Sequence, residues 1–175
     1  MPTRHIIIGG GPVATNAIES IRQFDNGESQ ITLICDEPAH SRMALPYWLS
    51  GQIPREQTHM ADDASFQKQG VEARIGARVN AIDPAAGSVT LADGDVLNFD
   101  KLLIATGSSP LRLNIPGIDL PGAETCWSLA DPESLLTSAG KLAKPRVLMI
   151  GARFSGLILL DAMSKLGWQL TVVER

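Results

Sequence analysis

The chain has 175 residues, of which 44% are hydrophobic and 19% are charged, as in ordinary globular proteins with one core or two small lobes. Its formal net charge of −4 argues against a nucleic-acid partner, and no apolar run is long enough to cross a bilayer. The two cysteines and three histidines show no metal-ligand spacing, so we expect no metal site. We expect Cys35 and Cys126 to be reduced thiols in a cytoplasmic protein.

The start of the chain predicts a strand–helix–strand unit. Residues 5–10 are an apolar run that ends in three glycines, and residues 13–24 carry hydrophobic side chains at helical spacing. The β-rich segment "QITLIC" follows at residues 30–35. Because such crossovers are right-handed, the two strands are expected to be parallel neighbours.

Prolines interrupt residues 36–60, which we expect to be irregular. The segment "DDASFQKQG" predicts a short helix that Gly70 ends. Residues 71–98 are expected to form an antiparallel meander with Asp93-Gly94 as a hairpin turn. The nearly all-apolar "KLLIATG" that follows is typical of a buried strand in the middle of a parallel sheet.

The second part of the chain repeats the plan of the first. The proline- and glycine-rich "SSPLRLNIPGIDLPGA" is the best boundary in the sequence, and a weak helical pattern follows at residues 131–143. Residues 146–174 then show a second strand, glycine turn, helix and strand. Since residues 5–37 share this plan, the chain is expected to hold two related nucleotide-binding lobes.

The first glycine motif is Gly9-x-Gly11-x-x-Ala14. Gly9 permits the tight turn out of the strand, Gly11 lets the backbone approach a pyrophosphate, and Ala14 lets helix and strand pack closely. The helix N-terminus then offers N–H groups to phosphates. Asp36 ends the second strand, where a carboxylate accepts hydrogen bonds from a ribose diol. A tight turn without a ligand explains the glycines alone, but the whole combination predicts dinucleotide binding.

The second motif keeps its outer glycines, Gly151 and Gly156, but has Arg153 at the middle position. The charge of arginine attracts phosphate, whereas its side chain occupies the space that a glycine leaves open. Because steric effects act at contact distance, we expect the usual pose of the pyrophosphate to be lost or displaced. Glu174 ends the last strand and favours the 2′-hydroxyl of NADH over the 2′-phosphate of NADPH, an inference that the adjacent Arg175 weakens.

Three features together resemble the FAD-dependent pyridine nucleotide–disulfide oxidoreductase family: the first motif with Asp36, the segment "LLIATGSSP" before "IPG", and the second glycine motif about forty residues later. The resemblance covers nearly the whole chain. It implies an α/β fold in which a Rossmann-like FAD-binding lobe with an inserted antiparallel meander, residues 1–117, precedes the start of a Rossmann-like NAD(P)H-binding lobe, residues 118–175.

The resemblance also implies which residues meet the cofactors. FAD contacts are expected at the first glycine turn, at the ends of two further strands and, by a softer alignment, in the meander: Gly9, Gly11, Pro12, Val13, Ala14, Asp36, Glu37, Thr106, Gly107 and Val79. NAD(H) or NADP(H) would be held by Gly151, Gly156 and Glu174. No residue is assigned a catalytic role, since no side chain is a convincing general acid or base.

The loop "HSRMALPYWLSG" selects a branch of the family. Members with a redox cysteine carry it in a similar context, but Met43 stands here and cannot form a thiolate. The loop resembles that of ferredoxin, rubredoxin and nitrite reductase flavoproteins. Arg42 is then a phosphate contact or, alternatively, a solvated charge, and Tyr47 and Trp48 cover the flavin ring or pack in the core.

The resemblance implies an NAD(P)H oxidoreductase that passes hydride from nicotinamide to flavin N5. Electrons would then pass to an external acceptor such as a small iron–sulfur protein, a linked reductase centre or oxygen. The resemblance also implies a homo-oligomer. The family's later segments, including a Gly-Asp pair that contacts the flavin, have no counterpart in these 175 residues, and Gly94-Asp95 lies in the hairpin. We therefore expect a fragment that is inactive alone; the alternative is a non-catalytic FAD-binding, nucleotide-binding or interaction module.

Overall fold

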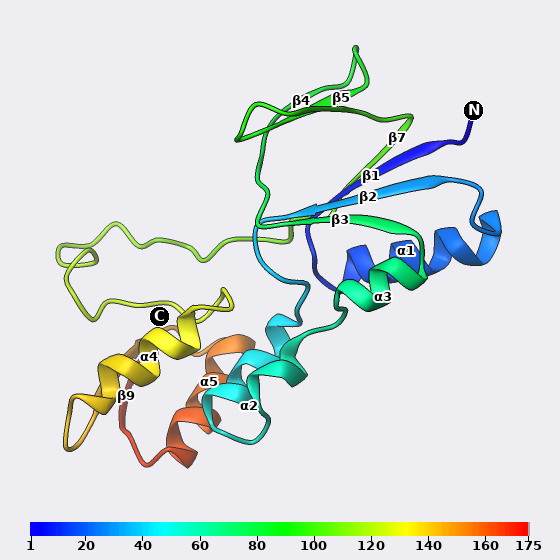
Figure 1. Ribbon diagram of the computed structural model, residues 1–175. Coiled ribbons are helices and arrows are strands. Elements are labelled where there is room, and N and C mark those ends of the chain that lie inside the picture. The colour runs from blue at the N-terminus through cyan, green and yellow to red at the C-terminus, as the bar shows by residue number, and fades with distance from the viewer. Residues whose placement is uncertain (175) are drawn as a thin grey trace. The chain divides into compact units, whose positions relative to one another are not determined.

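The computed structural model describes residues 1–174, which form two compact units (Figure 1). The first unit contains Met1–Ser41 and His59–Ser108. The second unit contains Arg42–Thr58 and the chain from Ser109 onward. The chain thus passes between the units within the expected proline- and glycine-rich linker, but the second unit also takes in an earlier segment. A domain boundary between residues 117 and 118 remains a prediction.

A four-stranded parallel sheet forms the centre of the first unit. Its strands are β1 (Arg4–Ile8), β2 (Gln30–Cys35), β3 (Val71–Ile75) and β7 (Lys101–Ile104), in the order β3-β2-β1-β7. The predicted parallel pairing of the first two strands is confirmed, with Ile8 opposite Ile34. All carboxyl ends therefore lie at one edge of the sheet.

Two expectations about this sheet are wrong. Residues 71–75 do not begin the antiparallel meander, because β3 pairs in parallel with β2. Within residues 1–174, β7 lies at an edge rather than in the middle of the sheet, and Ile104 is 60% exposed. The apolar pattern of a strand reports that its faces can be buried, but it does not identify the neighbouring strand.

The sheet is covered on both faces (Figure 1). Helices α1 (Pro12–Asp25) and α3 (Asp63–Lys68) pack on one face, around Ile7. The other face of β1, with Ile6 and Ile8, packs on the meander strands β4 (Val79–Asp83), β5 (Ser88–Leu91) and β6 (Val96–Asn98). Successive side chains of a strand point to opposite faces, which explains the unbroken apolar run of β1. The hairpin turn at Asp93-Gly94 is confirmed, with Gly94 at φ +97°.

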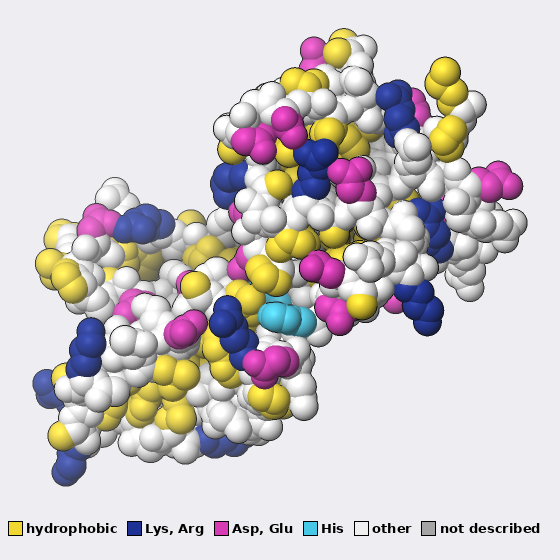
Figure 2. Space-filling model, viewed as in Figure 1, with side chains coloured by type: hydrophobic (Ala, Val, Ile, Leu, Met, Phe, Trp, Pro, Cys, Tyr) yellow, Lys and Arg dark blue, Asp and Glu magenta, His cyan; other side chains and the backbone are white. Residues whose placement is uncertain are grey.

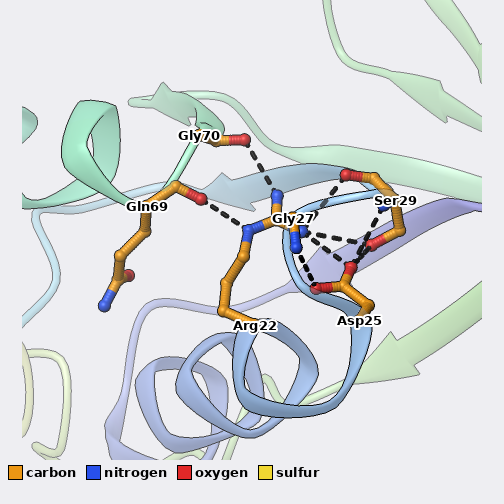
Figure 3. Close-up of polar contacts among 6 residues, drawn as sticks. All are labelled: Arg22, Asp25, Gly27, Ser29, Gln69 and Gly70. Carbon is orange, nitrogen blue, oxygen red and sulfur yellow. Dashed lines mark hydrogen bonds and ion pairs between the residues drawn. The ribbon is translucent and has the colours of Figure 1, made fainter.

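A cluster around Arg22 holds the far end of α1 (Figure 3). Its guanidinium donates hydrogen bonds to the carbonyl oxygens of Gln69 (2.5 Å), Gly70 (3.0 Å) and Ser29 (3.1 Å), and forms an ion pair with Asp25 (2.9 Å). Asp25 in turn accepts a hydrogen bond from the Ser29 hydroxyl. One side chain therefore fixes the end of α1, the entry to β2 and the turn between α3 and β3.

The second unit contains a two-stranded parallel sheet of β8 (Arg146–Ile150) and β9 (Gln169–Val173), joined by α5 (Phe154–Lys165). The predicted second strand–helix–strand unit is thus confirmed. Helix α4 (Asp131–Gly140) precedes it, slightly shorter than expected. Residues 42–58 are not irregular throughout, because they form α2 (Leu45–Leu49) between the short 3₁₀ turns η1 (Arg42–Ala44) and η2 (Arg55–Thr58).

Helix α2 joins the core of the second unit through Leu49, which packs with Ala162 and Met163 of α5. Leu45 and Leu49 are four residues apart and both are buried, so this short helix presents one apolar face. The strand face turned away from this core is open: Leu148 is 60% exposed and Ile150 is 51% exposed. Figure 2 shows that charged side chains of both signs are interspersed over the face drawn, as expected from exposed ion pairs such as Arg74–Asp95.

Candidate functional site

The first glycine turn follows β1 and lies between the carboxyl ends of β2 and β7. The Gly9 N–H donates to the Ile34 carbonyl oxygen (2.8 Å), and the Ala105 N–H donates to the Ile8 carbonyl oxygen (2.7 Å). Gly9 has φ +108°, and a Cβ atom there would lie 2.3 Å from the Ala105 carbonyl oxygen. Only glycine fits this position, because a side chain would meet backbone and would also strain the turn.

Gly11 is different, since a Cβ atom there would meet nothing within 4 Å and its φ of −82° suits any residue. It is the N-cap of α1, which starts at Pro12. Val13 in the first turn is 62% exposed, whereas Ala14 is fully buried against the sheet. The structure therefore leaves open space beside Gly11, at the place where a pyrophosphate needs close approach to the backbone.

The N-terminus of α1 is suited to an anion. No side chain of residues 1–174 caps it, and its first turn contains no carboxylate. Helix α3 shows the contrast, because Asp62 caps it by accepting a hydrogen bond from the Ser65 N–H (2.8 Å). Uncapped N–H groups and the helix dipole attract negative charge, so the expected phosphate position has the right electrostatic character.

The end of β2 places two neighbouring side chains on opposite faces. Cys35 packs on the helix face with the core around Ile7, and its sulfur lies 3.1 Å from where a Cβ atom of Gly10 would be. Burial, with the nearby charges of Asp36 and Glu37, raises the pKa of the Cys35 thiol to about 11, so it stays protonated at neutral pH.

Asp36 points the other way and forms an ion pair with Arg78 (2.8 Å). Glu37 lies 3.8 Å from Nε2 of the buried His40, whose Nδ1 faces the Pro38 carbonyl oxygen at 2.9 Å. Arg78 was not among the site residues predicted from the sequence. Its position directly before Val79, an expected cofactor contact, was the only available signal.

The remaining residues expected in the first site lie at the same edge of the sheet. Thr106 and Gly107 follow β7 and are exposed, and Gly107 has φ +70°. Val79 is half-buried and begins β4, three residues after Gly76 closes the end of β3. The structure thus brings the glycine turn, the acidic end of β2 and the end of β7 to the carboxyl ends of adjacent parallel strands, where open α/β sheets hold ligands.

The second glycine turn repeats the backbone geometry of the first but carries different residues at positions 153 and 156. The Gly151 N–H donates to the Val173 carbonyl oxygen (2.9 Å), and Gly151 has φ +100°. Arg153 is the N-cap of α5 with φ −67°, and no carboxylate lies in the first turn of that helix. A Cβ atom at Gly156 would lie 2.5 Å from the Gly151 carbonyl oxygen, so this glycine provides the close packing of turn and helix.

Glu174 directly follows β9, and its carboxylate accepts a hydrogen bond from the Ala152 N–H. It therefore faces its own glycine turn, as Cys35 does in the first unit. Arg175, which weakened the inference about the nicotinamide cofactor, lies outside the described residues.

Arg42 belongs to the second unit, where its guanidinium lies over the ring of Trp127, 4.9 Å from the ring centroid. Tyr47 is 45% exposed and lines a surface pocket with Phe154 and Leu157. The guanidinium of Arg55 lies over the ring of Trp48, 5.6 Å from the ring centroid. Whether Arg42 contacts phosphate, and whether Tyr47 or Trp48 covers a flavin, remain predictions.

Within residues 1–174, no group of three or more histidine, cysteine, aspartate or glutamate side chains is arranged to hold a metal ion. No helix among these residues is both long and apolar enough to span a membrane.

Comparison with known proteins agrees with this geometry. The chain is 32% identical over 175 residues to the NADH-dependent phenylglyoxylate dehydrogenase subunit epsilon of Aromatoleum evansii, covering 98% of this chain and 41% of that protein. It is 31% identical to the rhodocoxin reductase of Rhodococcus erythropolis, covering 97% of this chain and 40% of that protein. The chain thus spans about two fifths of the length of these relatives.

Solved structures show the same fold. The water-forming NADH oxidase from Lactobacillus brevis, solved bound to NADH, superposes with a TM-score of 0.88 at 26% identity, over 98% of this chain and 39% of that one. An NAD-dependent persulfide reductase from A. fulgidus gives a TM-score of 0.87 at 30% identity, over 98% of this chain and 34% of that one. Residues 3–175 match the pyridine nucleotide-disulphide oxidoreductase family, and the chain belongs to that family.

Proposed function

We propose that this chain supplies the first part of the FAD site and part of the NAD(P)H site of an FAD-dependent NAD(P)H oxidoreductase that delivers electrons to an external acceptor. The observation that carries the proposal is the open space at Gly11 beside the uncapped N-terminus of α1. A side chain at Gly11 would fit the fold without conflict, so the fold does not itself require glycine there. A ligand that approaches the backbone does require it.

The residues around this space fit the adenosine diphosphate portion of FAD. The N-terminal N–H groups of α1 would bind the pyrophosphate, and Asp36 would accept hydrogen bonds from the ribose. Thr106 and Gly107 follow the neighbouring strand and would line the same site. Bound FAD would supply the redox chemistry, by accepting hydride from nicotinamide at its N5 atom and passing electrons on. The chain's own residues would bind and orient the cofactors and exclude water.

The names of several relatives support one class of acceptor. Curated relatives include a probable ferredoxin reductase and the rhodocoxin reductase, and one similar solved complex joins putidaredoxin reductase to putidaredoxin. We therefore propose a small iron–sulfur protein as the electron acceptor. The absence of a cysteine at Met43 supports an acceptor outside the chain, because a thioether cannot form a mixed disulfide.

A non-catalytic nucleotide-binding module is the second candidate, and one observation favours it. Arg153 occupies the N-cap of α5, the position of Gly11 in α1, and the adjacent Ala152 N–H already binds Glu174. Both features reduce the room and the free donors for a second pyrophosphate. FAD would then be retained while NAD(P)H binds weakly or not at all.

Titration of the purified chain with FAD, followed by anaerobic addition of NADH, separates the two. Flavin bound by the protein, with its absorbance bleached by NADH, supports the oxidoreductase. Bound flavin that NADH does not bleach supports the binding module for this chain. A protein that does not bind FAD at all contradicts both, because both depend on the first glycine turn.

A further inference from the structure

The ion pair between Asp36 and Arg78 lies at the edge of the sheet where the proposed cofactor site is built. Asp36 follows β2 on the face that carries the meander, and Arg78 precedes β4. Nη1 of Arg78 lies 2.8 Å from Oδ2 of Asp36. The two side chains are 71% and 57% exposed, so a ligand at this edge can reach both.

The backbone under Arg78 is held from two sides. The Ala77 N–H donates to the Cys35 carbonyl oxygen (3.1 Å), which joins this loop to the end of β2. The Arg78 carbonyl oxygen accepts a hydrogen bond from the Ala92 N–H (2.8 Å), which joins it to the meander. The guanidinium therefore starts from a fixed backbone position directly across from Asp36.

The ion pair is not needed to hold the fold together. Exposed pairs contribute about 0–1 kcal/mol, and the hydrogen bonds of Ala77 and Ala92 already attach the loop. Arg78 does, however, restrict Asp36. A carboxylate has about four lone-pair sites, and Arg78 takes one on Oδ2. Within residues 1–174 no hydrogen bond is formed to Oδ1 of Asp36, so this oxygen stays available to a ligand.

We propose that Arg78 is a positioning residue, which orients the Asp36 carboxylate so that it accepts hydrogen bonds from the ribose diol of the adenosine portion of the cofactor. The inference rests on the proposed FAD site and assigns it a residue that acts through Asp36. A freely rotating carboxylate must lose that freedom when it binds the diol, whereas one that is already hydrogen-bonded to a guanidinium loses less of it.

The test compares ADP with 2′-deoxy-ADP by calorimetric titration, because the two differ only in the hydroxyl that Asp36 would read. Wild-type protein is expected to prefer ADP by about tenfold, the effect of one hydrogen bond to a charged group. Asp36→Asn lowers this preference several-fold. Arg78→Ala is expected to lower it similarly, and Arg78→Lys to restore part of it, because a lysine keeps the charge but not the planar fork.

Arg74→Ala is the matched control. Arg74 lies in β3, pairs with Asp95 at the same 2.8 Å length and with Glu72 at 2.9 Å, and its side chain is 31% exposed. Its removal costs the meander an ion pair of the same kind, and it is expected to leave the preference for ADP unchanged. Urea unfolding of both variants checks that they fold equally well.

The outcomes are distinct. An Arg78→Ala protein that loses affinity for ADP and 2′-deoxy-ADP by the same factor overturns the inference in favour of a direct phosphate contact. Unchanged affinity for both also overturns it. A wild-type protein that binds FAD and ADP without preferring the 2′-hydroxyl overturns the role of Asp36 in reading the ribose, and Arg78 with it. A wild-type protein that does not bind FAD overturns the proposed function itself.

Discussion

The two strand–helix–strand units share one backbone plan but differ at several positions that would touch a dinucleotide. Ile8 lies opposite Ile34 in the first unit, and Ile150 lies opposite Val173 in the second. In both, the glycine after the first strand donates its N–H to the carbonyl oxygen of that opposite residue. The strand register and the first hydrogen bond of the turn are therefore the same in both units, and the units differ in their side chains.

This shared register shows that the two acidic residues are not equivalent. Glu174 is one residue past Val173, whereas Asp36 is two residues past Ile34. Side chains alternate along a strand, so Glu174 occupies the place of Cys35 and faces its glycine turn, and Asp36 faces the meander instead. Both residues are strand-ending acids in the sequence, and the shift between them becomes visible only when the strands are paired.

The close contact at each turn is also made by a different glycine. In the first unit Gly9 abuts the carbonyl oxygen of Ala105, which follows β7. In the second unit a Cβ atom at Gly151 would meet nothing within 4 Å among the described residues, and Gly156 makes the close contact instead. A neighbouring strand thus decides which glycine of the motif is sterically obligatory.

Replacing Gly9 with alanine is expected to have the largest effect. The new Cβ atom clashes with backbone and must adopt φ +108°, which together cost about 3 kcal/mol or more of the free energy of unfolding. Gly151→Ala is the matched variant, because it has the same strain at φ +100° but no clash, and about 1–2 kcal/mol is expected. Urea unfolding measures both, and equal losses would contradict the role of the neighbouring strand.

The far ends of the two helices give the next comparison. Arg22→Ala leaves the carbonyl oxygens of Gln69 and Gly70 without their donor and should cost about 2–3 kcal/mol. Lys165 ends α5 with an exposed ion pair to Asp161, so Lys165→Ala should cost at most about 0.5 kcal/mol. Thermal unfolding of the two variants checks the difference. A loss in Lys165→Ala as large as in Arg22→Ala would show that the cluster around Arg22 stabilises the protein no more than an exposed ion pair does.

A smaller effect on the stability of the fold is expected when the pH is lowered. The hydrogen bond from the Ser29 hydroxyl, with those from the Gly27 and Ser29 N–H groups and the charge of Arg22, lowers the pKa of Asp25 from 3.8 to about 2. Because the folded pKa lies below the unfolded one, this stabilisation is complete above pH 3.8 and is lost as the pH falls toward 2. Asp25→Asn should therefore show a shallower loss of stability over that range.

The slope should not vanish in Asp25→Asn, because Arg4 lowers the pKa of Asp100 to about 2 in the same way. Unfolding followed by circular dichroism between pH 5 and 2 measures this slope, and an unchanged slope would contradict the assignment to Asp25.

Local patterns in the sequence predicted most of the elements, and long-range pairing explains the failures. The first strands, α1, the meander hairpin and the second unit follow from apolar spacing, glycines and short loops. The pairing of β3 with β2 depends on contacts between segments about forty residues apart, which periodicity does not encode. Helix α2 was missed because Pro46 lies within it and Pro54 follows soon after it, although the buried Leu45 and Leu49 carried a weak helical signal.

The candidate site was predictable to the same degree. Glycine spacing located the turn, since the demand of Gly9 for a positive φ is local. The partner of Asp36 was not predictable, because Arg78 reaches it only after β3 joins the sheet. The cofactor roles of all the predicted site residues, Arg42 and Val79 included, remain predictions.

The central claim is that Gly11 is kept free of a side chain for a ligand rather than for the fold. Gly11→Arg copies the residue of the second unit and tests this claim most directly, because φ −82° and the empty surroundings accommodate any side chain. The account predicts unfolding within about 0.5 kcal/mol of wild type and a loss of FAD affinity of at least about tenfold by fluorescence titration. A Gly11→Arg protein that binds FAD as tightly as wild type would contradict it.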